Sequence, residues 1–350
     1  MQNPSSHFNA STFYPDHANL LVYRDADGAE HPVTNAAEWA QRRAHILENM
    51  QLVMGPLPDE SSKVPPAREV LEEVRLPEFT RRKITFAVEA NDRLPAYLLI
   101  PHTINDQAPA MLCLHQTTPL GMKQPVGIGE QPNFHYAAHL AARGYVTLAP
   151  EYCLPIVSPQ HGDYGEYHID AYAMGYASNT MKGIWNHRRA IDLLQALPEV
   201  DNEKIGCIGH SLGGHNSMFA AAFDARLKVI VSSCGFTAET KYYGGDLTDW
   251  SHKGYMPRIE EVYYSEPYNM PFDFHEVVAA LAPRPFFVNA PLHDDNFDPS
   301  GVDDCIAAAL PIYQLLEAGE KLKVMHPDCG HDFPDAERQA AYDWLDRWLK

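Results

Sequence analysis

Residues 209–215 read "GHSLGGH" and place a lone serine, Ser211, between glycines directly after the short apolar run "KIGCIG". The apolar run indicates a buried strand, and "HNSMFAAAF" after it indicates a helix. A serine on so sharp a strand-to-helix turn needs small residues two positions before and after it, and Gly209 and Gly213 provide them. The turn would expose the hydroxyl and direct the next backbone N–H, that of Leu212, to the same place. The alternative is a glycine-rich connection in which the serine only caps the helix.

The acid that a nucleophilic serine requires is expected on a loop after a later strand. A serine hydroxyl is a weak nucleophile without a base, and the base needs an orienting acid. In strand–turn–helix sites of this kind the chain order is serine, acid, histidine. The apolar run "PFFVNA" ends in "PLHDDNFD", which offers Asp294, Asp295 and Asp298. We prefer Asp294 because it lies three positions past Pro291, where such loops turn, and Asp295 is the second choice.

The histidine and the remaining oxyanion donor are expected on two further loops. The run "KLKVMH" leads into "PDCGHDFP", where His331 follows a glycine at the loop tip, whereas His326 still belongs to the strand. The run "PAMLCLH" leads into His115-Gln116-Thr117-Thr118. The backbone N–H of Thr117 is the first candidate for the second oxyanion donor, with Gln116 next. Together with Leu212, these residues predict an oxyanion hole.

The alternation of strand-like and helix-like patterns along the chain predicts an α/β architecture. "KITFAVE" and "PAYLLIP" form a hairpin pattern from about residue 82, and short apolar runs then alternate with helical patterns. Apolar runs of this length are typical of parallel strands covered on both faces. We therefore expect a mostly parallel, doubly wound sheet of about eight strands with helices on both faces. Residues 1–80 are expected to form an accessory segment with one main helix, and residues 81–350 the catalytic domain.

Composition restricts the classes of function. The formal net charge of −19 argues against nucleic acid and anionic membranes as partners. The six cysteines form no CxxC pair, and this pattern is typical of buried free thiols rather than of disulfides or a zinc site. The N-terminus lacks a signal-peptide pattern, so a cytoplasmic location is expected, although a trimmed secreted form would look the same. Self-association is left open.

From about residue 82 to its end, the chain resembles the α/β-hydrolase superfamily, in particular dienelactone hydrolases and acetylxylan esterases. The resemblance rests on "LHQTTPLG", "GYVTLAPEY", "GHSLGGHNS" and "CGHDFP". The segment "PFDFHEVVAALAPRPFFV" also resembles glucuronoyl esterases, but Leu212 stands where those enzymes have an arginine beside the serine. The resemblance implies an α/β-hydrolase fold and a serine hydrolase that needs no metal or cofactor and acts through an acyl-enzyme. Ser211, Asp294 and His331 would form its triad.

Two insertions, 153–176 and 237–270, are expected to cover the carboxyl edge of the sheet as short caps. Both are rich in tyrosine, and their aromatic rings and polar groups suit a sugar or an aryl ester. The alternative is that these rings pack the caps against the sheet. The acidic and histidine residues of the first insertion lack a metal-ligand spacing, so no metal is expected. The candidate pocket residues are His115, His210, Tyr164, Trp250 and Tyr255.

These observations predict a hydrolase for carboxylic esters, with small acyl or carbohydrate-linked esters as substrates. Glucuronoyl-ester or lactone hydrolysis is an alternative. A serine peptidase of the prolyl-oligopeptidase type shares the triad order, but residues 1–80 are too few for the propeller of that family. A catalytically silent binding protein would not need the complete set of serine, acid and histidine.

Overall fold

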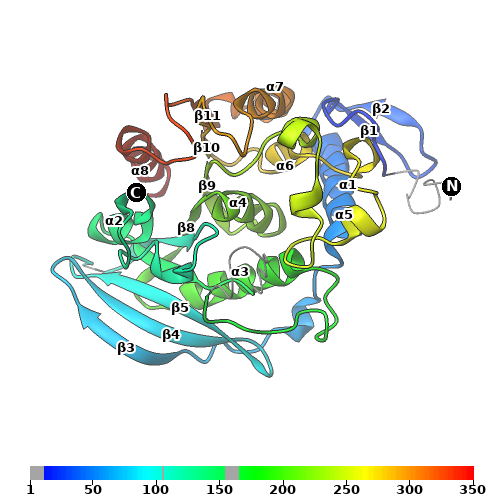
Figure 1. Cartoon of the computed structure of the whole chain (residues 1–350). Coiled ribbons are helices and arrows are strands. Elements are labelled where there is room, and N and C mark those ends of the chain that lie inside the picture. Colours follow the sequence, from blue (N-terminus) through cyan, green and yellow to red (C-terminus); the bar gives the residue numbers. More distant parts are fainter. Residues whose placement is uncertain (1–11, 105, 154–164) are drawn as a thin grey trace.

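A nine-stranded sheet forms the centre of the molecule in the computed structural model, which describes residues 12–104, 106–153 and 165–350 (Figure 1). Its strands lie in the order β11-β10-β9-β8-β6-β7-β5-β4-β3. The strands are β3 (Glu69–Arg75), β4 (Phe79–Glu89), β5 (Asp92–Pro101), β6 (Ala108–Leu114), β7 (Val146–Pro150), β8 (Val200–His210), β9 (Leu227–Ser233), β10 (Phe286–Asn289) and β11 (Leu322–Met325). The mostly parallel, doubly wound sheet expected from the sequence is confirmed, with one strand more than the predicted eight.

Strands β6 to β11 are parallel to one another, and the helices that connect parallel strands cover both faces of this part of the sheet. Side chains alternate along each strand: in β9, Val229 and Val231 face one half of the core and Ile230 faces the other. Helices α2 and α8 pack on the first face, and α3 and α4 on the second, with α6 and α7 beside them. The helices are α2 (Tyr136–Ala142), α3 (Asn179–Gln195), α4 (Leu212–Phe223), α6 (Phe274–Ala280), α7 (Pro299–Leu315) and α8 (Asp335–Leu349).

The other end of the sheet is antiparallel and contains the strand that the sequence did not predict. Strands β4 and β5 form the predicted hairpin, and the alternating Ile84, Phe86 and Val88 of β4 are fully buried. Strand β3 pairs with β4 at the sheet edge and is exposed along nearly all of its length. Its residues 69–75 fall within the segment predicted to be accessory. Because β3 has no buried face, its sequence carries no alternating apolar pattern.

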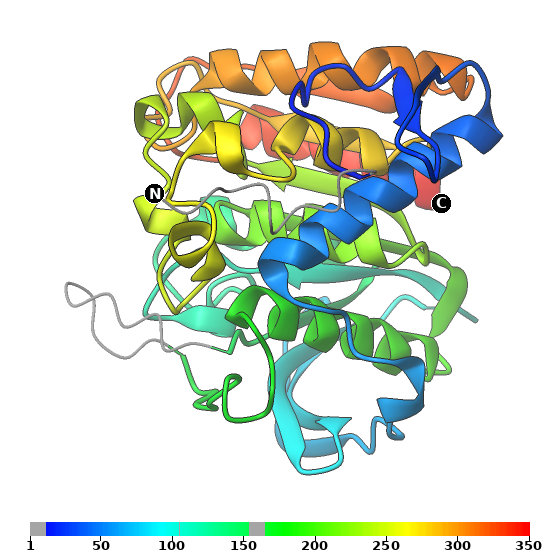
Figure 2. The same ribbon diagram turned by 90° about the vertical axis from the view of Figure 1, so that its right-hand side faces the viewer.

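The N-terminal segment packs beside α6, on the helical layer that covers one face of the sheet. Helix α1 (Ala36–Met54) crosses beside α6 and α5 (Arg258–Glu261), as Figure 2 shows, and the short strands β1 (Val22–Arg24) and β2 (Glu30–Pro32) precede it. A buried ion pair joins Arg42 Nη2 to Glu276 Oε1 at 2.5 Å. Arg43 donates to the backbone oxygens of Ala222 and Ala280. These contacts attach α1 to the helical layer over the sheet.

The loops that follow the parallel strands meet at one edge of the sheet, where this class of fold binds its ligands. Of the first predicted insertion, residues 154–164 lie outside the described residues. The second insertion folds into short helical turns, among them Glu239–Gly244, Thr248–Trp250 and α5. Within the described ranges, no helix is both long and apolar enough to span a membrane.

Candidate active site

Ser211 occupies a strained turn between β8 and α4. Its φ of 53° and ψ of −119° are rare for a residue with a side chain, and such a conformation costs about 1–3 kcal/mol. The Ser211 N–H donates to Ser233 O at 2.8 Å, which ties the turn to the end of β9. A Cβ atom at Gly209 would lie 2.1 Å from Gly213 O, and one at Gly213 would lie 1.9 Å from Leu114 O. The local backbone therefore requires both glycines, as the sequence pattern predicted.

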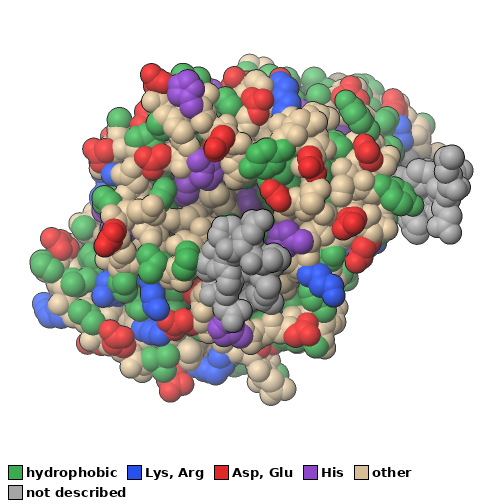
Figure 3. Space-filling model, in the orientation of Figure 1, with side chains coloured by type: hydrophobic (Ala, Val, Ile, Leu, Met, Phe, Trp, Pro, Cys, Tyr) green, Lys and Arg blue, Asp and Glu red, His purple; other side chains and the backbone are tan. Residues whose placement is uncertain are grey.

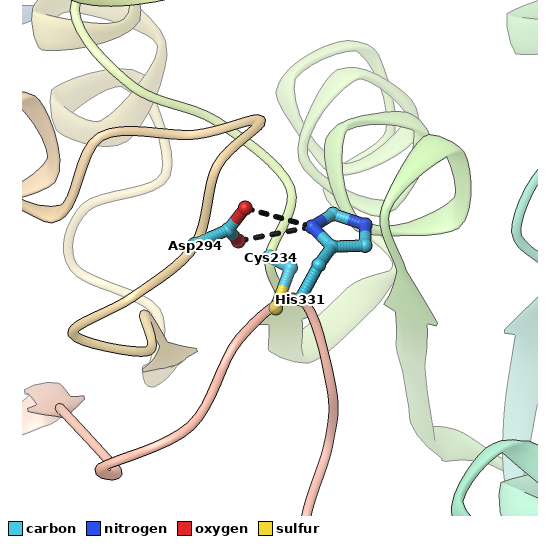
Figure 4. A group of neighbouring side chains, drawn as sticks. All are labelled: Cys234, Asp294 and His331. Carbon is cyan, nitrogen blue, oxygen red and sulfur yellow. Dashed lines mark hydrogen bonds and ion pairs between the residues drawn. The ribbon is translucent and has the colours of Figure 1, made fainter.

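His331 is oriented by Asp294, on the loop that follows β10 (Figure 4). His331 Nδ1 lies 2.9 Å from Asp294 Oδ1 and 3.0 Å from Oδ2. The Asp294 side chain is 1% exposed, and its Oδ1 also accepts the backbone N–H groups of Asn296 and Phe297. Burial raises the pKa of Asp294, but the hydrogen bonds from His331 and the backbone outweigh it and hold the pKa below its ordinary value. The carboxylate thus stays ionised and fixes a hydrogen on Nδ1, which leaves Nε2 free to act as a base.

The other candidates for the acid, Asp295 and Asp298, and the other histidine, His326, have different partners or none among the described residues of this site. Asp295 is exposed, and Asp298 caps α7 by accepting the Ser300 N–H at 2.8 Å. His326 follows β11 and contacts Ala290 O and Asp303. Among these candidates, Asp294 is the carboxylate that contacts His331.

A pocket of about 250 Å³ joins Ser211, His331 and the predicted oxyanion loop. It is lined by Gln116, Thr117, Thr118, Pro119, Gln131, Phe134, His210, Ser211 and His331. Histidine side chains also gather around a hollow in the middle of this face of the molecule (Figure 3). Leu212 begins α4 directly after the serine, so its N–H belongs to the first turn, whose amides have no partner within the helix. The predicted donors Leu212, Thr117 and Gln116 therefore lie next to Ser211, and their roles stay predictions.

His115 lies beneath the oxyanion loop rather than in the pocket, contrary to its prediction as a pocket residue. It is 1% exposed, its Nε2 lies 2.8 Å from Glu151 Oε1, and its Nδ1 lies 2.7 Å from Gln116 O. Both partners are acceptors, so both ring nitrogens carry hydrogens and the ring is an imidazolium ion. Burial raises the pKa of Glu151, but the hydrogen bond and positive charge of His115, together with hydrogen bonds from the backbone N–H groups of Tyr152 and Met122, outweigh it and hold the pKa below its ordinary value. This ion pair anchors the backbone of Gln116.

The remaining predicted pocket residues have different positions. Trp250 is 6% exposed and packs against His215 and Phe274, so it fills the core of the second insertion instead of the pocket. Tyr255 lines a smaller pocket that also contains Leu212. His210 lines the main pocket, and Tyr164 lies outside the described residues. The sequence reasoning missed Phe134 and Gln131, which come from a loop without a recognisable motif.

Cys234 was also missed, although it lies directly beneath the acid and the histidine (Figure 4). It follows β9 with a φ of 48°, and it is buried. Its pKa is raised by burial and by the neighbouring Asp294. The thiol therefore stays protonated and forms part of the support of the acid.

Among the residues that the structure describes, two groups of three side chains offer ligand atoms within 4.8 Å of one another, close enough to hold a metal ion. These groups are Cys234, Asp294 and His331, and Asp273, His275 and Cys305. In the first group, the carboxylate already orients the imidazole. In the second, the Asp273 carboxylate accepts the backbone N–H of Phe274 at the start of α6 and the backbone N–H of Glu239 in the second insertion. The carboxylates of both groups thus have hydrogen-bonding roles in the protein itself.

Several of the known proteins that this chain resembles are named as esterases. A sequence model of fungal glucuronyl esterases matches residues 160–317. The Bacillus subtilis (strain 168) protein YtaP, named as a hydrolase, is 24% identical over 89% of this chain and 99% of its own length. The 4-O-methyl-glucuronoyl methylesterase 1 of Wolfiporia cocos is 25% identical over 51% of this chain, and the match spans 48% of its own length.

The solved structure of a glucuronoyl esterase from Solibacter usitatus has a TM-score of 0.74 and 21% identity, and covers 96% of this chain and 98% of its own. The structural neighbours also include an acetyl xylan esterase. The α/β-hydrolase fold and the resemblance to acetylxylan and glucuronoyl esterases, both expected from the sequence, are confirmed. This chain has the α/β-hydrolase fold and resembles carbohydrate esterases.

Proposed function

We propose that the protein is a serine hydrolase that cleaves carboxylic esters through an acyl-enzyme. The observation that carries this proposal is the pocket in which Ser211 and His331 lie together, with His331 held through Nδ1 by the buried Asp294. A strained serine, a neutral histidine base and an ionised acid are the parts that acyl transfer requires. The esterase relatives support the choice of an ester over an amide.

In the first half of the reaction, Ser211 Oγ attacks the ester carbonyl carbon while His331 Nε2 removes the hydroxyl proton. Asp294 stabilises the positive charge that forms on the His331 ring. The backbone N–H groups of Leu212 and Thr117 are positioned to bind the oxyanion, and each such donor contributes about 3–4 kcal/mol to the barrier reduction. His331 then gives its proton to the leaving alcohol, and the acyl group remains on Ser211.

In the second half, water takes the place of the alcohol. His331 removes a proton from that water, which attacks the acyl carbonyl carbon, and the acid product leaves as His331 returns its proton to Ser211.

We propose carbohydrate-linked esters, including glucuronoyl esters, as the substrate class. The fungal glucuronyl esterase model and the methylesterase relative support this choice. The hydroxyl, amide and imidazole groups of the pocket wall suit a substrate with several oxygens. Glucuronoyl esterases have an arginine next to the serine. This chain has Leu212 at that position, so the proposed mechanism uses no such arginine. A cytoplasmic location and self-association stay predictions.

The test is an ester panel with Ser211→Ala as the control. The panel holds p-nitrophenyl acetate, butyrate and octanoate, acetylated xylose, methyl ferulate and a methyl glucuronate ester, with an aminoacyl anilide for peptidase activity. Hydrolysis of esters that Ser211→Ala does not catalyse supports the proposal. Hydrolysis of the anilide alone would instead indicate a peptidase, and equal rates in Ser211→Ala would contradict a serine mechanism.

A further inference from the structure

The tautomer of His210, the residue before the nucleophile, follows from a chain of hydrogen bonds behind it. Asn289 Nδ2 donates to Asp332 O at 2.9 Å and to Ser233 Oγ at 2.8 Å. Because a backbone carbonyl oxygen can only accept, the contact with Asp332 fixes the orientation of the Asn289 amide. Both hydrogens of this amide are then used, and Ser233 Oγ is an acceptor toward Asn289.

The hydroxyl hydrogen of Ser233 has two acceptors within reach. One is His210 Nδ1 at 2.9 Å, and the other is Cys234 Sγ at 3.8 Å. Since a thiol sulfur is a weak acceptor and the first distance is that of an ordinary hydrogen bond, the hydroxyl donates to His210 Nδ1. Burial, and the nearby His331, lower the pKa of His210 well below its ordinary value, so the ring stays neutral. A neutral imidazole that accepts at Nδ1 carries its hydrogen on Nε2.

The His210 ring that carries this N–H is 1% exposed and forms part of the wall of the active-site pocket. The His210 ring packs against Phe134 with 4.5 Å between ring centroids, and against His331 with 4.9 Å. It lines the same pocket as Ser211. Throughout the described part of the chain, no side chain or backbone group accepts a hydrogen bond from His210 Nε2. The pocket thus contains a fixed, uncharged donor beside the catalytic histidine.

The position of this donor indicates which part of the substrate it meets. His331 must protonate the oxygen of the departing alcohol, so the alcohol portion of the ester lies beside the His331 ring. We propose that His210 is a specificity-determining residue whose Nε2–H donates to an oxygen in the alcohol portion, which selects esters of oxygenated alcohols such as carbohydrates over esters of alkyl alcohols. This inference rests on the proposed ester hydrolysis.

Two acetate esters of equal length test the inference. The 2-methoxyethyl and n-butyl esters differ by one ether oxygen in place of a methylene group in the alcohol portion. The quantity measured is the ratio of their kcat/KM values, each divided by the rate of hydrolysis by hydroxide. The wild type should favour the methoxyethyl ester about threefold to tenfold, the effect of one neutral hydrogen bond. His210→Phe keeps an aromatic ring without the donor and should bring the ratio close to one.

Two further variants separate recognition from folding. Ser233→Ala removes the hydroxyl that fixes the tautomer, so it should lower the ratio even where His210→Phe does not fold. His215→Phe is the matched control, because His215 is also a buried, neutral histidine but does not line the pocket. It should leave the ratio unchanged.

The outcomes are distinct. A wild-type ratio near one, or a ratio unchanged in His210→Phe and Ser233→Ala while esters are still hydrolysed, overturns the role of His210 and leaves the esterase function intact. Loss in His210→Phe of discrimination between methyl methoxyacetate and methyl butyrate, with the alcohol pair unaffected, would place the contact on the acyl side and contradict the proposal. A folded wild-type protein that hydrolyses no ester overturns both proposals.

Discussion

Replacing Asp294 by asparagine reverses the hydrogen bond that orients the catalytic histidine. The asparagine side chain has the same shape as the aspartate, and its amide oxygen can keep the backbone hydrogen bonds now made by Asp294 Oδ1 with Asn296 and Phe297. Its NH₂ group then faces His331 Nδ1, which must become an acceptor. The ring hydrogen moves to Nε2, the nitrogen that has to take the proton of Ser211. The variant should therefore fold normally but have its base in the wrong tautomer.

The expected loss is large and falls on kcat. The same change in serine proteases lowers kcat about 10⁴-fold, and this corresponds to about 5 kcal/mol of transition-state stabilisation. The Asp294 side chain is 1% exposed, so solvent does not screen the lost charge interaction with the His331 imidazolium. KM should change little, because the pocket wall contains His331 but not Asp294.

The assay is steady-state hydrolysis of p-nitrophenyl acetate, with the urea unfolding curve of each variant as a check on folding. Asp295→Asn is the control, because Asp295 is the exposed neighbour on the same loop and should keep near wild-type kcat. An Asp294→Asn variant that retains a tenth or more of the wild-type kcat would refute the assigned role of Asp294. So would an equal loss in Asp295→Asn.

Three other perturbations have defined outcomes. Glu151→Gln leaves the buried His115 imidazolium without its anion, so the free energy of unfolding should fall by about 3–5 kcal/mol; unchanged urea unfolding would contradict the ion pair. Burial, with Asp273 and Glu276 nearby, raises the pKa of Glu239 well above its ordinary value, so this side chain is neutral in the folded protein and ionises on unfolding. The contribution of Glu239 to the free energy of unfolding should therefore fall as pH rises from its unfolded pKa toward its folded one, by about 1.4 kcal/mol per pH unit. Glu239→Gln should reduce that slope in urea unfolding series between about pH 5 and pH 7, whereas the exposed Glu320→Gln should keep it; an equal slope in both would contradict a neutral Glu239. Iodoacetamide should alkylate Cys329 first in the folded protein, because the other five cysteines are buried, and mass spectrometry showing faster labelling elsewhere would contradict that burial.

The features predicted from the sequence are those set by local backbone requirements or by continuous burial. The glycines beside Ser211 are needed by one turn, and the pattern therefore predicts that turn and its serine without any knowledge of the tertiary structure. The parallel strands are apolar on both faces, and so they read as uninterrupted apolar runs. Strand β3 lacks both signals because it lies at the sheet edge, exposed along nearly its whole length.

The features that were missed depend on contacts between distant parts of the chain. His115 was assigned to the pocket because it adjoins the oxyanion loop, but Glu151, from the end of another strand, pairs with it in the core. The sequence around Trp250 does not indicate whether its ring faces substrate or protein. In the structure the ring packs against Phe274 of α6, in the protein interior. Cys234 contacts the triad only because β9 and β10 are neighbours in the sheet.

Trapping the acyl-enzyme tests the central claim most directly. The protein is mixed with p-nitrophenyl acetate, quenched in acid during turnover, digested and analysed by mass spectrometry. The proposed mechanism predicts one acetyl group on the peptide that contains Ser211, located on the serine by fragmentation, and none in Ser211→Ala. Turnover with an unmodified Ser211, or with the acetyl group on another side chain such as Cys234, would contradict it.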